Sequence, residues 1–162
     1  MPSSNNNFPN RHHDHAVCIE SALVQAELLC RERGVRLTPL RRRVLEIVWE
    51  SHAPLGAYDA LQRMNAGGER NAPPTVYRAL DFLLKHGLIH RIESMNAFVG
   101  CATPEYTHKG QFFICRDCGN VAEAHSKEIS EAIEASATRT GFLVETPVVE
   151  ISGQCLECHD NE

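Results

Sequence analysis

The sequence predicts an α+β protein in which a mainly helical N-terminal domain precedes a smaller α/β domain. Three observations support this division. Apolar residues recur at helical spacing over much of residues 16–87, and an alternating hairpin pattern follows over residues 88–101. Beyond residue 110, strand-like stretches alternate with a helical one. The net charge also changes sign between the two parts of the chain.

The net charge of −5 hides this uneven distribution. Residues 31–91 carry 11 Lys and Arg against 6 Asp and Glu, whereas residues 92–162 carry 4 against 12. A basic segment beside an acidic one predicts that contact with a polyanion is confined to the first. The length fits two small domains, since 162 residues can bury two modest cores.

The helical stretches have recognisable boundaries. Thr38 is expected to cap the second helix, with Pro39 at its first position, where the missing N–H costs nothing. Gly34 and Gly87 are expected to end the first and fourth helices. Residues 1–15 lack periodicity and are rich in Asn, Ser, Pro and His, so they are expected to form a disordered arm. The expected helices begin near Ala16, Pro39 and Ala57 and after Thr75.

A hairpin is predicted directly after the fourth helix. Its strands are expected at residues 88–93 and 97–101, with Ser94-Met95-Asn96 as the turn. Short helices followed by a two-stranded ribbon are the element order of a winged helix-turn-helix. This domain is therefore expected to span residues 16–102, and the polar stretch at residues 103–110 is expected to be a hinge.

Residues 111–162 are predicted to form the second domain. Ser126 is expected to cap a helix that ends before Gly141. Pro147 must lie at an edge or a break of any strand that contains it, because it has no N–H to donate. Strands are expected at residues 111–114, 121–124 and 142–152.

The fourth helix carries polar residues in its first turn, the part of a recognition helix that enters the major groove. An Arg suits guanine edges or phosphates, and a Tyr offers its hydroxyl to a phosphate and its ring to a thymine methyl group. The alternative is that these side chains only solvate an exposed helix face. The element order and the basic charge favour DNA contact. The predicted DNA-binding residues are Thr75, Tyr77, Arg78, Arg41 and Arg42.

Four of the seven cysteines form two C-x-x-C pairs, Cys115/Cys118 and Cys155/Cys158. In a reducing compartment this spacing favours thiolate metal ligation over disulfides. Four thiolates close a tetrahedral shell and leave no position for water, which suits a structural zinc. The alternative is four inert core cysteines. Zinc would pin the tail at residues 154–162, which has almost no apolar content of its own.

A second set of donors is spread across the expected hinge. One ion that bound all of them would fix the angle between the two domains. Taken singly, each residue has a simpler explanation, as strand filling or as a solvated polar group. The set consists of His90, Cys101, His108 and Glu123.

Five motifs together give the chain a resemblance to a known family. From about Leu23 to Cys158 the chain resembles the ferric uptake regulator family of metal-dependent repressors, and specifically its zinc uptake regulator branch. The motifs are Val35–Arg41, Pro74–Leu83, His90–Asn96, Phe113–Gly119 and the Cys155/Cys158 pair.

This resemblance implies a homodimer with N-terminal winged helices and a small α/β dimerisation domain. It also implies two zinc ions per subunit, one structural and one regulatory. Tyr77 and Arg78 match the DNA-contacting positions of the family's recognition helix. By motif, the structural ligands fall on Cys115, Cys118, Cys155 and Cys158, and the regulatory ligands on His90, Cys101, His108 and Glu123.

The chain departs from the family pattern in its histidines. The arm with His12, His13 and His15 is additional to the pattern. The family's His-rich cluster before the first cysteine pair is reduced here to His108, which leaves a third metal site open. His125 and His159 are spare donors that are expected at the surface.

The residues and the resemblance together predict a zinc-responsive transcriptional repressor of zinc uptake genes. It is expected to bind a palindromic operator as a dimer when Zn²⁺ fills the hinge site. An iron- or peroxide-responsive repressor of the same family is the alternative, and Cys101 argues against it, since a thiolate favours Zn²⁺ over Fe²⁺ or Mn²⁺.

An enzyme is not expected. A zinc hydrolase needs an open metal position with a base beside it, and Glu123 could be that base, but no substrate cleft or nucleophile motif accompanies it. No small-molecule substrate or membrane partner is expected either. The polar N-terminus and the absence of an apolar run long enough to span a bilayer predict a cytoplasmic protein.

Overall fold

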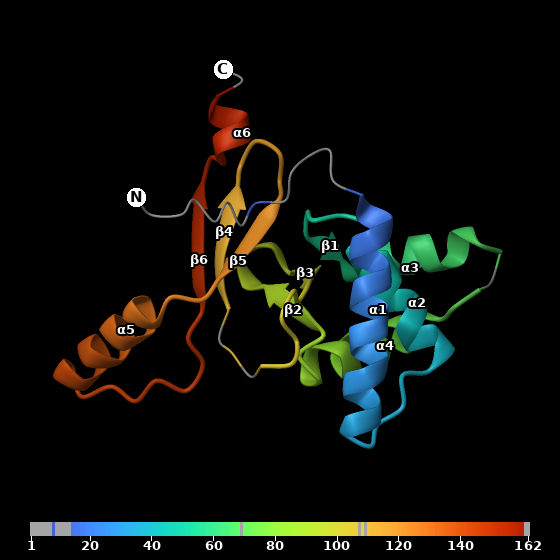
Figure 1. The fold of residues 1–162 in the computed structure, drawn as a ribbon, viewed down its shortest axis with the longest axis horizontal. Coiled ribbons are helices and arrows are strands. Elements are labelled where there is room, and N and C mark those ends of the chain that lie inside the picture. The colour runs from blue at the N-terminus through green and yellow to red at the C-terminus, as the bar shows by residue number, and fades with distance from the viewer. Residues whose placement is uncertain (1–7, 9–13, 69, 107, 109, 161–162) are drawn as a thin grey trace.

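The structure is a computed structural model that describes residues 8, 14–68, 70–106, 108 and 110–160. The chain first forms a helical N-terminal domain and then a C-terminal domain built on a sheet (Figure 1). The N-terminal elements are α1 (His15–Glu32), α2 (Pro39–Trp49), β1 (Leu55–Gly56), α3 (Ala57–Ala66), α4 (Pro73–Lys85), β2 (Ile89–Ile92), the 3-10 turn η1 (Glu93–Met95) and β3 (Ala97–Gly100). The C-terminal elements are β4 (Gln111–Cys115), β5 (Val121–Ala124), α5 (Lys127–Arg139), β6 (Val149–Gly153) and α6 (Leu156–His159).

Helix boundaries follow the capping residues in the sequence. The Thr38 side chain accepts a hydrogen bond from the Arg41 N–H at 3.4 Å, and α2 begins at Pro39, both as predicted. The Ser126 hydroxyl likewise accepts from the Ile129 N–H at 3.3 Å and starts α5. Asp14 caps α1, which begins at His15 and so takes one residue from the expected arm. The arm's His12 and His13 lie outside the described residues.

The core of the N-terminal domain lies where α2 and α4 cross. Each helix buries the apolar residues that recur at helical spacing. Packing of these buried faces fixes the orientation of the two helices, and so of their exposed residues. Burial of side chains of this size stabilises the fold by about 1.5–3 kcal/mol each. The fully buried side chains here are Val44, Leu45, Ile47, Val48, Val76, Leu80 and Leu83.

The N-terminal sheet has three strands in the order β1-β3-β2, and not the two predicted from the sequence. The additional strand β1 pairs Leu55 with Phe98 and Gly56 with Ala97. Two residues are too few to show the alternation that identifies a strand, so only the tertiary pairing reveals it. The hairpin of β2 and β3 is as predicted, with Asn96 in the left-handed conformation at its turn.

The C-terminal sheet has the order β5-β4-β6, with β5 antiparallel and β6 parallel to the central strand β4. The strand predicted over residues 142–152 is shorter, because the β-structure begins at Val149. Pro147 explains the difference, since it cannot donate to a ladder and ends pairing on its N-terminal side. Helix α6 was not predicted, because four residues are too short for a periodicity.

Three kinds of contact join the two domains. An apolar cluster draws Ile92 and Val99 from the N-terminal sheet and Phe112 and Val121 from the C-terminal sheet. The Val121 N–H also donates to the backbone carbonyl of His52 at 3.1 Å. The third contact consists of polar side chains and is described below. Across the described residues, none of the helices has the length and apolar content that crossing a bilayer requires.

Helix α5 projects from the C-terminal sheet and packs little against it (Figure 1). Ala137, at 9% exposure, is the one buried residue of α5 among the described positions. The segment after it also exposes large apolar side chains, which a lone globular domain would cover. These are Phe142, Leu143 and Val148, with Ile151 on β6.

Candidate metal centres and recognition helix

The two cysteine pairs meet at the end of the C-terminal sheet. Cys115 ends β4, Cys118 lies in the following turn, and Cys155 and Cys158 flank the start of α6. All four sulfur atoms lie within 4.8 Å of one another. Cys118 Sγ and Cys155 Sγ are 3.9 Å apart. A tetrahedral zinc with Zn–S bonds of about 2.3 Å separates its sulfurs by about 3.8 Å, so the residues fit this ion.

The local backbone favours a thiolate at Cys115. Burial opposes ionisation there, but backbone N–H groups of Cys118, Cys155 and Asp117 lower the pKa of Cys115 to about 6. At Cys158, burial and the neighbouring sulfurs raise the pKa to about 12. Four thiolates cannot collect in this space without a cation to compensate their charge. A metal ion would therefore displace protons from the cluster and hold α6 against the sheet.

The cysteine cluster is partly covered by a residue from the other end of the chain. Phe8 packs against the sulfur cluster, together with Cys118. An aromatic ring over thiolates limits the access of water and chelators to them. The arm predicted to be disordered therefore makes at least this contact with the C-terminal domain.

The second set of donors also converges, and it does so between the domains. His90 comes from β2, Cys101 follows β3, His108 lies in the connecting segment and Glu123 comes from β5. Their ligand atoms lie within 4.8 Å of one another. Glu123 Oε1 is 2.8 Å from His90 Nε2 and 2.7 Å from His108 Nε2. Cys101 Sγ is 3.5 Å from His108 Nε2.

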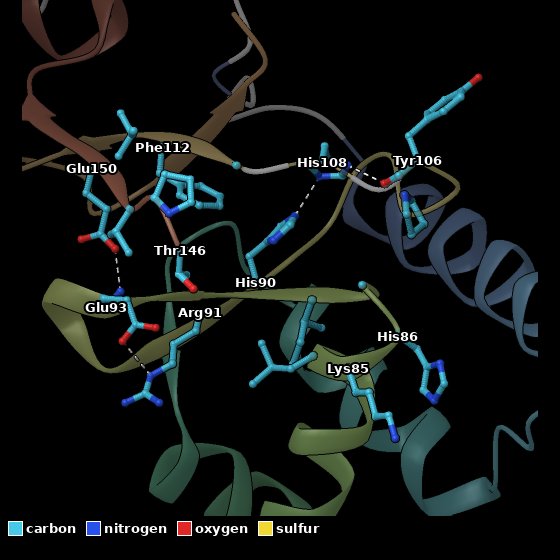
Figure 2. Close-up of a pocket in the computed structure, with 18 of the residues that line it drawn as sticks. Lys85, His86, His90, Arg91, Glu93, Tyr106, His108, Phe112, Thr146 and Glu150 are labelled. Atoms are coloured by element: carbon cyan, nitrogen blue, oxygen red, sulfur yellow. Dashed lines mark hydrogen bonds and ion pairs between the residues drawn. The ribbon is translucent and has the colours of Figure 1, made fainter. Parts of the chain in front are cut away.

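The histidine at the centre of this set is oriented for a metal. His108 Nδ1 lies 2.7 Å from the carbonyl oxygen of Tyr106, which only accepts hydrogen bonds, so Nδ1 carries the proton (Figure 2). In the neutral ring Nε2 is then the bare nitrogen. That atom faces His90 Nε2 at 3.1 Å. A metal-bound imidazole usually donates the N–H of its other ring nitrogen to a hydrogen-bond acceptor, as His108 Nδ1 does here to the Tyr106 carbonyl.

The environment of the hinge set shifts the pKa values of its two acidic groups, Cys101 and Glu123, in opposite directions. Burial first, and then the charge of Glu123, raise the pKa of Cys101 to about 12. Burial also opposes ionisation of Glu123, but the hydrogen bond and positive charge of His90, with His108, lower its pKa below the ordinary value. The site thus holds a ready carboxylate and a protonated thiol, and a divalent cation would displace the thiol proton.

His125 lies closer to the hinge set than the sequence indicated. It is exposed, as expected, but its ring packs edge-on against His108 with centroids 4.3 Å apart. Its Nε2 is 3.8 Å from Glu123 Oε1. No sequence signal marks this contact, since it arises from the turn between β5 and α5. His159 is exposed at the chain's end beside Asp160.

The first turns of α4 present polar residues to solvent. Thr75, Tyr77 and Arg78 are exposed on the face opposite the buried Val76 and Leu80. This is the arrangement expected of a recognition helix, with its apolar face against α2 and its N-terminal turns free to enter a groove.

The predicted arginines of α2 are held by the chain itself. The Arg41 guanidinium lies 3.7 Å over the ring of Phe82 and donates to the Arg36 carbonyl at 2.6 Å. Arg42 pairs with Glu27 at 2.9 Å. Arg41 thus braces α4 from the side, and DNA contact by either residue stays a prediction.

A winged helix joined by four converging metal-type donors to a second domain with a four-cysteine cluster is the arrangement expected of a metal-dependent regulator. The chain belongs to the ferric uptake regulator family, whose sequence model matches residues 32–152. Membership of a regulator family confirms the expectation that the chain is not an enzyme. The family resemblance predicted from the motifs is confirmed as well.

Relatives within the family are similar along most of the chain. The zinc uptake regulation protein of Escherichia coli K12 is 38% identical over 144 residues, which cover 88% of this chain and 84% of that protein. A solved zinc uptake regulator complexed with zinc and DNA superposes with a TM-score of 0.82 at 38% identity, covering 88% of this chain and 96% of that one. Both comparisons support the predicted α+β fold.

One further relative has been solved in two states. The holo structure of XcZur superposes on this chain with a TM-score of 0.79 at 39% identity, covering 86% of this chain and 98% of that one. The apo structure gives 0.52 at 38% identity, covering 87% and 97%. At nearly equal sequence identity, the chain therefore superposes better on the holo structure than on the apo structure.

Proposed function

We propose that this protein is a zinc-responsive transcriptional repressor that binds operator DNA when Zn²⁺ occupies the hinge set. The observation that carries this proposal is the hinge set itself, because its four donors come from both domains and the segment between them. An ion bound there links the position of α4 to the position of the C-terminal sheet. The better superposition of this chain on the holo than on the apo structure of XcZur supports the same proposal.

Zinc is the ion that the donor chemistry favours. The set of His90, Cys101, His108 and Glu123 supplies two imidazoles, a thiolate and a carboxylate, which suits a tetrahedral Zn²⁺. The harder ions Fe²⁺ and Mn²⁺ bind thiolates less well in competition with zinc. With the four-cysteine cluster as a structural site, we propose two zinc ions per subunit. Four protein ligands would fill a tetrahedral shell, so this site would keep no open position for catalysis.

We further propose that the repressor is a homodimer. Helix α5 and the segment after it offer an apolar surface that the subunit itself does not cover, including Phe142 and Leu143. Among the strands that the structure describes, β6 pairs only with β4, so its outer edge is available to another strand. A two-fold dimer through this surface presents two α4 helices, which matches a palindromic operator with half-sites about one helical turn or a multiple apart.

The remaining assignments follow from the same picture. Residues 16–102 are the DNA-binding domain, residues 103–110 the hinge and residues 111–162 the dimerisation domain. We place Thr75, Tyr77 and Arg78 in the major groove. Zinc acquisition genes are the proposed targets, since a repressor that binds DNA only when zinc is plentiful limits further uptake. Such a repressor acts in the cytoplasm.

The test is a DNA-binding titration at buffered free metal concentrations. The probe is an operator duplex selected from random-sequence DNA with the zinc-loaded protein, and its binding is followed by fluorescence anisotropy. Free zinc should raise the affinity for the operator duplex about 5- to 150-fold, the usual range of allosteric coupling. The fraction of dimer should stay constant over the titration. The same titration is run with Fe²⁺ and with Mn²⁺. An equal response to Fe²⁺ would favour the iron or peroxide sensor. DNA affinity that does not change with any of the three metals would reject the proposal.

A further inference from the structure

A second polar bridge crosses between the two domains, away from the hinge donors. The carboxylate of Glu150, on β6, accepts hydrogen bonds from the backbone N–H groups of Glu93 at 2.6 Å and Ser94 at 3.1 Å. Both N–H groups belong to η1, the turn at the tip of the N-terminal hairpin. Figure 2 shows this contact on the opposite side of the close-up from His108. We name the contact between Glu150 and η1 the wing clasp.

The wing clasp and the hinge donors share one row of the C-terminal sheet. Phe112 on β4 pairs in register with Glu123 on β5 and with Glu150 on β6. Laterally paired residues point to the same face of a sheet, so these three side chains face the N-terminal domain together. The Phe112 ring packs edge-on against His90 with centroids 5.3 Å apart. One row of the sheet therefore meets the N-terminal domain at three points.

On the N-terminal side these points lie along strand β2. His90 is near the start of this strand, and η1 follows its end. Three residues of strand span about 10 Å, so the two polar bridges hold β2 at separate places. A single bridge leaves the domains free to pivot about it, whereas two separated bridges fix an orientation. The cleft between the bridges has a volume of about 650 Å³ and is lined by both domains.

We propose that Glu150 is a positioning residue that sets the angle between the winged helix and the dimerisation domain, without touching zinc or DNA. This role rests on the proposed function, because it supplies the metal-independent half of the closed arrangement. Zinc binding then has less to order, since one end of β2 is already held. In linkage terms, the clasp raises the fraction of the competent conformation and so lowers the zinc concentration that is needed.

The chemistry of the clasp suits this role. Burial works against the charge of Glu150, but the hydrogen bonds from Ser94 and Glu93 outweigh it and hold the pKa below its ordinary value. Charge-assisted bonds to backbone N–H groups are among the stronger hydrogen bonds of proteins. A hydrogen bond from the Ser94 side chain also lowers this pKa, so the clasp draws on one side chain of the turn as well as on its backbone. Glu93 remains able to pair with Arg91, whose Nε lies 3.4 Å away.

The test compares the Glu150→Gln and Glu150→Ala variants with the parent protein. Gln keeps the size of the side chain but turns one acceptor into a donor that opposes the N–H groups. Glu20→Gln is the matched control, since Glu20 is an exposed carboxylate on α1 and its loss changes the net charge equally. Free zinc is titrated against binding of the selected operator duplex, and amide hydrogen exchange is measured at Glu93 and Ser94 in the zinc-loaded dimer.

Both Glu150 variants should need about 5- to 30-fold more free zinc for half-maximal DNA binding, which corresponds to one or two kcal/mol. Their dimer content and structural zinc should match the parent. Amide exchange at Glu93 and Ser94 should become faster in both, and the Glu20→Gln control should behave as the parent. A zinc midpoint within twofold of the parent in both variants would overturn the positioning role. Unchanged amide exchange would overturn the clasp itself.

The same experiment tests the proposed zinc response separately from the positioning role of Glu150. If the parent binds the operator equally at every zinc concentration, the zinc response is rejected. The positioning role is then judged at one zinc concentration, by whether Glu150→Gln binds the operator more weakly than Glu20→Gln does. Equal binding by these two variants would reject the positioning role as well.

Discussion

The two candidate metal centres differ in their donors, four sulfurs against a mixed set, and they also connect the chain in different ways. The four-cysteine cluster takes all its donors from the C-terminal domain, at the edge of one sheet. The hinge set draws its donors from β2, the end of β3, the connecting segment and β5. A metal in the first site stabilises a domain, whereas a metal in the second relates two domains to each other. The origin of the ligands, together with their chemistry, separates the proposed structural site from the proposed regulatory one.

The largest effect is expected from breaking the four-cysteine cluster. Cys155→Ser should unfold the C-terminal domain and abolish dimerisation, because structural zinc in small domains contributes about 10–16 kcal/mol of apparent binding free energy. Sedimentation velocity and zinc analysis of the purified variant measure both losses. A stable dimer without zinc in this site would show that the cluster is not structural, and the contrast between the two sites would disappear.

The hinge set should behave in the opposite way. Cys101→Ala should keep the dimer and the structural zinc, since the two sites share no residue. It should bind the operator poorly at zinc levels that saturate the parent, because loss of a residue that only supports a metal ligand already costs about 10- to 100-fold in metal affinity, and Cys101 is proposed to be a ligand itself. Excess zinc should restore part of the binding, with water as the fourth ligand. Anisotropy titrations with the operator duplex measure this shift.

Cys30→Ala is the control for this substitution. Cys30 and Cys101 are each 3% exposed, so both variants remove an equally buried sulfur. Cys30 lies in the core of the N-terminal domain and belongs to neither metal set. The control should lower the thermal stability slightly and leave the zinc midpoint unchanged. Equal zinc midpoints for the two variants would mean that Cys101 only fills space.

A smaller effect is expected where neither metal is involved. Arg78→Ala should weaken operator binding by about 1–3 kcal/mol while zinc content, zinc midpoint and dimerisation stay constant. Arg42→Ala should weaken it less, because Arg42 is paired with Glu27. Anisotropy at saturating zinc distinguishes the two. A larger loss of operator affinity from Arg42→Ala than from Arg78→Ala would show that α4 is not the helix that enters the groove.

The smallest effect concerns the cover of the cysteine cluster. Phe8→Ala should speed the removal of structural zinc by a chelator a few-fold, because the ring packs against the sulfurs. Operator binding and the zinc midpoint of the hinge set should not change. Stopped-flow absorbance with a chromophoric chelator follows the release. A faster release from the hinge set instead would show that the arm covers the other site.

The cysteine cluster could be predicted from the sequence because its signal is local. Two C-x-x-C pairs specify both the ligands and their geometry within a few residues. The hinge set is different, since the spacing of its donors has no local pattern. Their placement across the expected hinge made them a candidate set, and the family resemblance then implied that they are ligands. The structure brings these four residues together, but their binding of zinc stays a prediction.

Other features depend on tertiary contacts that leave no trace in the sequence. The bracing of α4 by Arg41 needs Phe82 on a different helix, so the sequence indicated only DNA contact or a solvated helix face for this residue. Glu150 looked like one more carboxylate in a strand, because its partners are backbone N–H groups in another domain. Helix starts were easier to predict from the sequence. Thr38 and Ser126 cap their helices as predicted, because a capping side chain bonds to a backbone N–H only three residues away.

The parallel pairing of β4 with β6 has a consequence for the order of folding. This pairing joins segments separated by the whole of β5 and α5, and Cys115 pairs in register with Gly153, two residues before Cys155. Closing a loop of about 40 residues costs about 3 kcal/mol of chain entropy before any strand contact forms. Zinc captured by both cysteine pairs closes the same loop first. Refolding should therefore be faster when zinc is present from the start than when it is added late.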